Sequence, residues 1–491
     1  MNQVKFGWAE VDITPTEKIA LRGEFFERVT NEVETPISFT ALAVESDGDQ
    51  AVIVSADLVG ISNDLTAEAA EKLKKMGLNG LDPEKIIVSA VHTHNSYDYG
   101  YTEDGVSDVE TVKKYLEPGC EYVPADHDPD QMSPVKALHF LSDKLAEAVY
   151  KAWNERKPGG FANGFGRAAV GMCRRVCYAD DTAKMWGDVD HAAFTQLEGG
   201  NDNGIEMLFI YNADKKLTGV VANIACPAQV LEQRTFISSD YWGKVKIMLR
   251  EKYGKDLFLL ALCAPAGDQC PRDLVRWVQP ETPIKDPNVI RENPKERRAD
   301  PSMFDIKGTW TIARRIVNEI DYALSEVTEI KTEAKLTHVA KVIYLPLRRV
   351  TETDRLFAEK QITEFFHGKK TINYMDTAAV YVYSGILDRY EEQKTQDVVE
   401  TKVNHIRFDD IAFSTSPFEL FLDYGNQIRA RSKAKQTFLI QLTAGDYGYL
   451  PTETAEKHGH YSAYVSSGCV GHVGGDILVR DALTEINKMF D

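Results

Sequence analysis

Short apolar runs alternate with amphipathic segments through the first half of the chain. Runs of strand length occupy 37–46, 50–58, 85–91, 207–212, 218–226 and 257–264. Helical periodicity follows at 64–76, ended by Gly77, and again after Ser133-Pro134, where Ser is the expected N-cap. A third helix is expected from Ser239 or Asp240 to Gly254. Strands that alternate with helices predict an α/β core.

The second half mixes the two periods less regularly. It predicts a helix over 304–327, strands over 337–349, 404–415 and 437–444, and helices over 352–366, 417–431 and 475–489. Two segments interrupt the pattern. Residues 98–132 are rich in Tyr, Asp, Glu and Gly and look like an insertion, while 278–301 carry five prolines and many charges, as in a linker or long surface loop. We therefore expect one large domain over 1–491, with mixed central sheets and flanking helices.

Composition narrows the choice of partners and compartment. A net charge of −18 over 491 residues repels nucleic acid and anionic membranes. The seven cysteines are odd in number and form no CxxC pair, so a reducing, cytoplasmic compartment is expected. The N-terminus has no apolar segment typical of a signal peptide, and the longest apolar run, 257–264, is too short to cross a bilayer. Both a monomer and a homo-oligomer are compatible with this composition.

The first chemical candidate is the sequence "SAVHTH" at the end of the run 85–91. Because side chains alternate faces along a strand, we expect His92 and His94 to point the same way, with Val88 and Ala90 behind them. Two imidazoles at the carboxyl end of a strand suit a metal ligand and a neighbouring base, because ligands of α/β sheets bind at that edge. The structural alternative is a pair of hydrogen-bonded loop histidines.

A second candidate, "CAPAGDQCPRD" at 263–273, also follows an apolar run. Gly267 allows a turn, Asp268 and Arg272 offer charge to a catalytic site, and Cys270 offers a nucleophile. A structural turn with a buried thiol is the alternative.

Two further segments each have a structural alternative. Ser416-Pro417-Phe418-Glu419 fits a capping box for the predicted helix 417–431, although Glu419 is also a candidate ligand. The tyrosines of "GDYGYLPT", 445–452, are packed aromatic residues on that alternative.

Together these segments resemble the neutral ceramidase family. The segments that carry the resemblance are "WAEVDITP" near the start, "SADLVGIS" at 55–62, "SAVHTH", "APAGDQCPRD" at 264–273, "SPFELF" at 416–421 and "GYLPT" at 448–452. They follow the family's order and spacing over nearly the whole chain. The chain is most similar to bacterial relatives that carry the amidohydrolase domain without the C-terminal immunoglobulin-like domain.

The resemblance implies a zinc-dependent hydrolase of amide bonds. By position, His92 matches the first zinc histidine, and Glu419 and Tyr449 match the carboxylate and tyrosinate ligands. His94 matches a histidine that faces the substrate. Cys270 stands at a serine of the family motif, and Arg174 stands where an arginine contacts the substrate.

One expected ligand is missing. The family has a second zinc histidine in a segment that reads "NIACPAQV" here, with Cys226 or Pro227 at its place. Three possibilities remain: Cys226 ligates zinc as a thiolate, His191 supplies the imidazole, or no metal binds.

The resulting hypothesis is a zinc hydrolase of an amide or related acyl bond in a small, polar substrate. The polar insertion after His94 motivates the substrate class, because its tyrosines and carboxylates would stand beside the metal. One alternative is a glycosidase whose carboxylates come from Asp190, Asp240, Asp268 or Glu419. Another is a binding protein that has lost the metal.

Overall fold

The computed structural model describes residues 2–24, 26–101, 109–124, 130–276, 305–445 and 447–491. The proline-rich segment 278–301 lies outside the described residues, as do parts of the insertion at 98–132. The prediction of a single domain over 1–491 stays a prediction.

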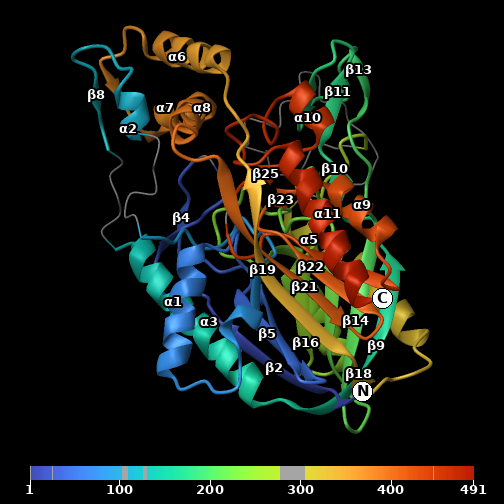
Figure 1. The fold of residues 1–491 in the computed structure, drawn as a ribbon. Coiled ribbons are helices and arrows are strands. Elements are labelled where there is room, and N and C mark those ends of the chain that lie inside the picture. The colour runs from blue at the N-terminus through green and yellow to red at the C-terminus, as the bar shows by residue number, and fades with distance from the viewer. Residues whose placement is uncertain (1, 25, 102–108, 125–129, 277–304, 446) are drawn as a thin grey trace.

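An eight-stranded sheet forms the centre of the molecule (Figure 1). Its strand order is β16-β15-β14-β9-β2-β5-β6-β7, in which only the two edge pairs, β15–β16 and β6–β7, are parallel. The strands are β2 (Lys5–Asp12), β5 (Ser38–Ser46), β6 (Asp49–Ala56), β7 (Ile86–Ala90), β9 (Lys157–Arg167), β14 (Gly204–Asn212), β15 (Leu217–Ile224) and β16 (Phe258–Cys263). The apolar runs thus became strands as predicted, whereas the glycine-rich β9 gave no apolar signal.

A second sheet of four strands, β19-β21-β22-β24, packs on one face of the first. Its strands are β19 (Leu336–Pro346), β21 (Val398–Phe408), β22 (Ile411–Thr415) and β24 (Gln436–Ile440). Rings of both sheets meet between them, such as Phe161 and Phe408 with centroids 4.5 Å apart. The single strand predicted over 404–415 is wrong: Asp409, with φ of 55°, and Asp410 turn the chain into a β21–β22 hairpin.

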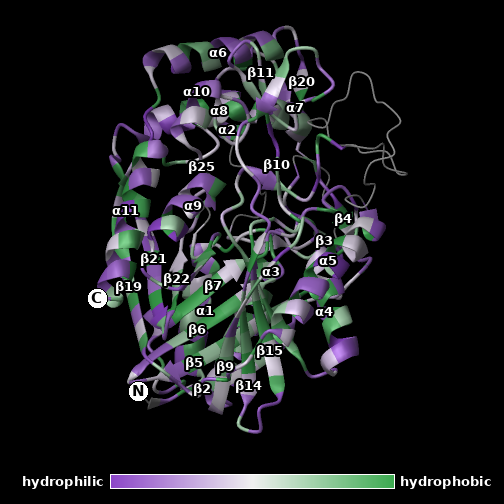
Figure 2. Ribbon diagram, turned by 90° about the vertical axis from the view of Figure 1, so that its right-hand side faces the viewer, coloured by the Kyte–Doolittle hydropathy of each residue, from purple (hydrophilic) through white to green (hydrophobic). Residues whose placement is uncertain are grey.

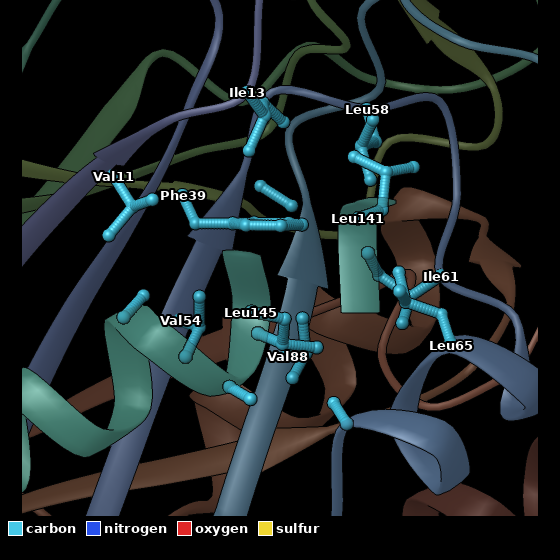
Figure 3. Packing of buried hydrophobic residues seen from close by; sticks show 14 of the residues in the cluster. Val11, Ile13, Phe39, Val54, Leu58, Ile61, Leu65, Val88, Leu141 and Leu145 are labelled. Carbon is cyan, nitrogen blue, oxygen red and sulfur yellow. The ribbon is translucent and has the colours of Figure 1, made fainter. Parts of the chain in front are cut away.

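Helices cover the outer faces of both sheets (Figure 2). Figure 3 shows Leu141 and Leu145 of one such helix facing Val54 and Val88 of the large sheet. The covering helices are α1 (Asn63–Lys75) and α3 (Pro134–Asn154) on one half of the large sheet, α4 (Asp240–Tyr253) and α5 (Asp305–Ser325) on the other half, and α9 (Leu422–Arg431) and α11 (His472–Met489) on the small sheet. The predicted layers of mixed sheet and helix are confirmed.

A small helical unit stands apart from these layers, at the top of Figure 1. It contains α2 (Val109–Lys113), β8 (Glu121–Tyr122), α6 (Glu352–Phe366), β20 (Thr371–Ile372), α7 (Tyr374–Ala379) and α8 (Tyr381–Glu392). Val112 of the predicted insertion is fully buried in its core, and β8 pairs with β20. Part of the insertion therefore folds with residues more than two hundred positions later in the chain.

Several short elements lie outside these layers. They include β1 (Asn2–Gln3) paired with β18 (Glu333–Ala334), β3 (Ile19–Ala20) paired with β4 (Val29–Thr30), and a 3-10 helix at Pro83–Lys85. A three-stranded sheet of order β12-β11-β13 is formed by β11 (Arg175–Tyr178), β12 (Ala183–Met185) and β13 (Phe194–Leu197), and α10 spans Glu453–His458.

The carboxyl ends of three strands, taken from both sheets, lie close together. β7, β16 and β24 end side by side: the N–H of Ala90 donates to Leu442 O at 3.2 Å, and the N–H of Gln441 donates to Cys263 O at 3.0 Å. The loops that leave these ends carry most of the residues singled out from the sequence, so the two-sheet packing brings them to one place.

Candidate active site

His92 begins the loop after β7 in a strained conformation. Its φ is 66°, in the left-handed region, so strand alternation does not extend beyond Ala90 and the premise that placed both histidines on one face is wrong. The two rings nevertheless meet, with Nε2 of His92 and Nε2 of His94 3.3 Å apart. Nδ1 of His92 lies 2.6 Å from Val59 O. Because a carbonyl only accepts, Nδ1 carries the hydrogen and Nε2 presents a lone pair to the site.

Glu419 faces that lone pair, with Oε2 3.5 Å from His92 Nε2. The capping-box prediction is wrong: helix α9 begins at Leu422, and Glu419 lies in the short strand β23 (Glu419–Leu420). This strand pairs in parallel with β25 (Tyr449–Leu450), which puts Glu419 opposite Tyr449. Burial and the charge of Glu419 raise the pKa of the Tyr449 phenol. His92, Glu419 and Tyr449 are therefore brought together as the sequence resemblance implied.

Gly267 allows this arrangement. A Cβ at this position would lie 2.3 Å from Glu419 O, and the N–H of Gly267 donates to Leu420 O at 2.9 Å. The loop after β16 thus holds the backbone of β23 at close range.

His94 is buried between polar side chains from two other loops. Its Nε2 lies 2.6 Å from Nε2 of Gln229. On the other side of the ring, Nδ1 is 3.8 Å from Oε1 of Glu24 and 3.8 Å from Oε2 of Glu232. Burial, the neighbouring His92 and nearby arginines lower the pKa of His94 far below its ordinary value, so the ring is neutral at pH 7.

Arg174 and Arg272 bring positive charge to the same place. Arg174 follows β10 (Met172–Cys173), and its Nη2 donates to Gly267 O at 3.0 Å and to the Tyr449 hydroxyl at 3.3 Å. Arg272 follows β17 (Gln269–Cys270), which pairs with β10, and its Nη1 lies 2.8 Å from Oε1 of Glu232. Both predicted arginines therefore lie among the site residues.

The other two residues of the 263–273 segment have different surroundings. Oδ1 of Asp268 accepts from the N–H of Leu422 at 2.9 Å, at the start of α9, and burial raises the pKa of this carboxyl to about 6. The Cys270 thiol donates to Arg272 O at 3.3 Å, and burial raises its pKa to about 12. These contacts support a capping function for Asp268 and a protonated Cys270.

The two candidates for the missing ligand differ in position. Cys226 is fully buried after β15, its thiol donates to Pro227 O at 3.4 Å, and burial raises its pKa well above the ordinary value. His191 is exposed, accepts from the N–H of Ala193 at 3.1 Å, and packs against Tyr178 at 5.6 Å. Within the described part of the chain, no hydrogen bond or ring contact joins His191 to His92, Glu419 or Tyr449.

The tyrosines after His94 do not line the site. Tyr97 and Tyr99 are buried in the core beneath α1 and α3, with their hydroxyls donating to Ile13 O and Gly60 O. Tyr101 is exposed and donates to Glu68. The expectation that this segment surrounds a metal with tyrosines is wrong for the described residues.

Sequence reasoning missed Glu24, Arg28, Gln229 and Glu232. Two of them stand in "ACPAQVLE", where a Gln and a Glu interrupt an apolar stretch after a strand; this is the signal that could have found them. Arg28 is buried and donates to four backbone carbonyls, and nothing in its local sequence indicates this.

The donor set around His92 fits a zinc ion. An imidazole lone pair, a carboxylate and a phenol are ligand types that zinc accepts, and three protein ligands are usual at a catalytic zinc. The 3.5 Å between Nε2 of His92 and Oε2 of Glu419 suits two ligands of one ion, since ligands about 2.1 Å from zinc lie roughly 3 to 4 Å apart. Two other groups of three ligand atoms lie close together in the described chain: Glu24, His94 and Glu232, and Cys177, Glu198 and His458.

Comparison with solved structures shows which proteins share this fold. The chain superposes over its full length on 75% of the neutral ceramidase from Pseudomonas aeruginosa, with a TM-score of 0.65 and 14% identity. It superposes equally on 76% of a ceramidase complexed with C2, with a TM-score of 0.64 and 12% identity. The chain has the fold of the neutral ceramidases. No protein-family model and no curated protein sequence matches it.

The neutral ceramidase fold agrees with the resemblance seen in the sequence. At such low identity the likeness concerns the fold, so activity rests on the geometry of the site. Within the described ranges, no helix is both long and apolar enough to cross a bilayer.

Proposed function

We propose that this chain is a zinc-dependent hydrolase of an amide or related acyl bond in a small, polar substrate. The observation that carries the proposal is the His92 lone pair, fixed by Val59 and aimed at Glu419 beside Tyr449. When bound there, zinc supplies a Lewis acid that polarises a carbonyl and acidifies water.

Each side chain of the site has a separate role in the proposed reaction. His92, Glu419 and Tyr449 would hold the ion. His94 is neutral, next to His92, and so able to donate a hydrogen bond to the acyl oxygen or pass a proton to the leaving group. Arg174 donates a hydrogen bond from Nη2 to the Tyr449 hydroxyl, and the same nitrogen lies 4.0 Å from Oε2 of Glu419. Its positive charge favours the ionised forms of both side chains. Arg272 orients Glu232, while Cys270 stays a thiol and takes no covalent part.

The substrate class follows from the polarity of the site. Charged side chains from four loops, Glu24, Arg174, Glu232 and Arg272, converge around His94, and each is nine-tenths or more buried. Such groups hydrogen-bond hydroxyl, amine or carboxylate groups well and solvate a long acyl chain poorly.

All seven cysteines are free thiols, which supports a reducing compartment such as the cytoplasm.

The test combines metal content with a substrate panel. The purified protein, expressed with zinc present, is analysed for metal together with His92→Ala and Glu419→Gln. We expect both variants to weaken zinc binding by about tenfold or more, because each removes a ligand. Short N-acyl amino sugars, N-acyl amino acids and polar amides are compared with detergent-solubilised long-chain ceramide. A higher kcat/KM for the ceramide would contradict the polar-substrate proposal, and unchanged zinc affinity in both variants would contradict the metal site.

A further inference from the structure

Glu24, His94 and Glu232 point three ligand atoms into one buried space. The atoms are Oε1, Nδ1 and Oε2, and both carboxylate oxygens lie 3.8 Å from the imidazole nitrogen. This separation is too long for a hydrogen bond. It agrees with two ligands of a shared cation, which lie roughly 3 to 4 Å apart at zinc-like bond lengths.

His94 gives independent support. The residue is 8% exposed, and its Nδ1 has no hydrogen-bond partner although the atom is buried. A buried ring nitrogen without a partner is costly, and here it faces two carboxylates that are themselves 8% and 5% exposed. A metal cation between them would give Nδ1 of His94 a partner and bind both carboxylates.

The surrounding structure holds the three ligands in place. Arg28 donates from Nη2 to the carbonyls of Arg22 and His94, and from Nη1 to those of Glu232 and Arg234. One buried guanidinium thereby joins the three loops that carry the ligands, and its Nη donors are used on backbone oxygens. Arg272 contacts the other oxygen of Glu232, Oε1, which leaves Oε2 directed at His94.

Gly23 completes the arrangement. Its φ is 113°, and a Cβ there would lie 2.5 Å from Cγ of His94. Only a glycine lets the loop of Glu24 approach the ring this closely and in this conformation.

We propose that Glu24, His94 through Nδ1, and Glu232 form a binding site for a divalent transition-metal cation, distinct from the His92–Glu419–Tyr449 site. An imidazole with two carboxylates is a ligand set suited to Zn²⁺ or Mn²⁺. Binding at Nδ1 places the ring hydrogen on Nε2, where it faces the Gln229 side chain. The Gln229 amide then turns its oxygen to His94, giving up the weak 3.4 Å contact between its oxygen and Arg174 Nη1. The proposal does not depend on the proposed hydrolase function.

The test measures cation binding to the full chain, stripped with chelator and titrated calorimetrically with ZnCl₂ or MnCl₂, with metal content checked by elemental analysis. Glu24→Gln and Glu232→Gln keep the side-chain shape and remove a charged ligand. Glu419→Gln reports on the other site, and Glu206→Gln, a part-buried glutamate on β14, is the matched control. Circular dichroism shows whether each variant is folded. Glu232→Gln also loses the ion pair with Arg272, and if this unfolds the protein, the test depends on Glu24→Gln alone.

We expect Glu24→Gln and Glu232→Gln each to weaken one binding event by about tenfold or more, while Glu419→Gln and Glu206→Gln leave that event unchanged. Parent affinity in Glu24→Gln, or no cation bound by the parent protein, would overturn the proposal. A binding event lost only in Glu419→Gln and His92→Ala belongs to the proposed hydrolase site, so failure of one proposal is separable from failure of the other.

Discussion

At the scale of single residues, burial sets the protonation state of several reactive side chains. Cys270, Cys226 and Tyr449 are all buried, and burial raises the pKa of each. Their residue types suggest a nucleophile and two metal ligands, but in the metal-free protein each retains its proton. His94 is affected in the opposite direction, because burial disfavours its cationic form.

Cys270→Ser is expected to keep its kcat/KM within about tenfold of the parent, since a thiol with a pKa of about 12 is protonated at pH 7 and a poor nucleophile. Steady-state kinetics on the best amide of the panel measure this. A mass-spectrometric adduct of substrate on Cys270 would show that the thiol is the nucleophile after all.

The buried carboxyl of Asp268 is expected to make the stability of the folded protein depend on pH. Burial raises its pKa from 3.8 to about 6 in the folded chain, so the folded state holds the proton more tightly than the unfolded state. The corresponding stabilisation, about 3 kcal/mol, is complete below about pH 4 and is lost as the pH rises through about 6. Urea unfolding between pH 4 and 7 should show the parent losing stability relative to Asp268→Asn. Parallel curves for the two proteins would mean that the carboxyl has an ordinary pKa.

At the scale of elements, pairings between two-residue strands bring site residues from distant segments together. β23 and β25 pair in parallel and set Glu419 opposite Tyr449, and β10 pairs with β17 to bring Arg174 and Arg272 into one site. Each pairing joins segments at least thirty residues apart, so neither appears in a local pattern. Gly267 lets the β16 loop approach β23 closely, since a Cβ there would lie 2.3 Å from Glu419 O.

Gly267→Ala is expected to destabilise the protein by about 1 to 3 kcal/mol and to weaken zinc binding, because its Cβ pushes on Glu419 O and moves the ligand. Gly200→Ala is the control, since a Cβ there meets no atom within 4 Å. Urea denaturation and zinc titration of both variants measure the two effects. Equal stability and zinc affinity in the two variants would show that β23 tolerates the methyl group.

At the scale of the whole molecule, two stacked sheets covered by helices bring the loops of the site together, and the chain carries a net charge of −18. That charge opposes docking on an anionic bilayer. We expect no co-sedimentation with vesicles containing anionic lipid at physiological salt, and none with neutral vesicles as control. Binding that grows with the anionic lipid fraction would contradict this expectation and weaken the case for a water-soluble substrate.

The sequence by itself determined the layers of the fold and singled out three residues that the structure brings together. Apolar runs and caps specify where strands and helices form, because those signals are local: Ser133 caps α3 as predicted, and the run 85–91 became β7. These residues, His92, Glu419 and Tyr449, were singled out through the resemblance to the neutral ceramidase family, and their role as ligands stays a prediction. The hairpin at Asp409 and the start of α9 were mistaken because a turn and a cap share polar residues. Only the tertiary structure decided that Glu24, Arg28, Gln229 and Glu232 surround His94. These residues come from two loops far apart in the sequence, and their meeting with the loop of His94 depends on how the strand ends converge, which no local pattern encodes.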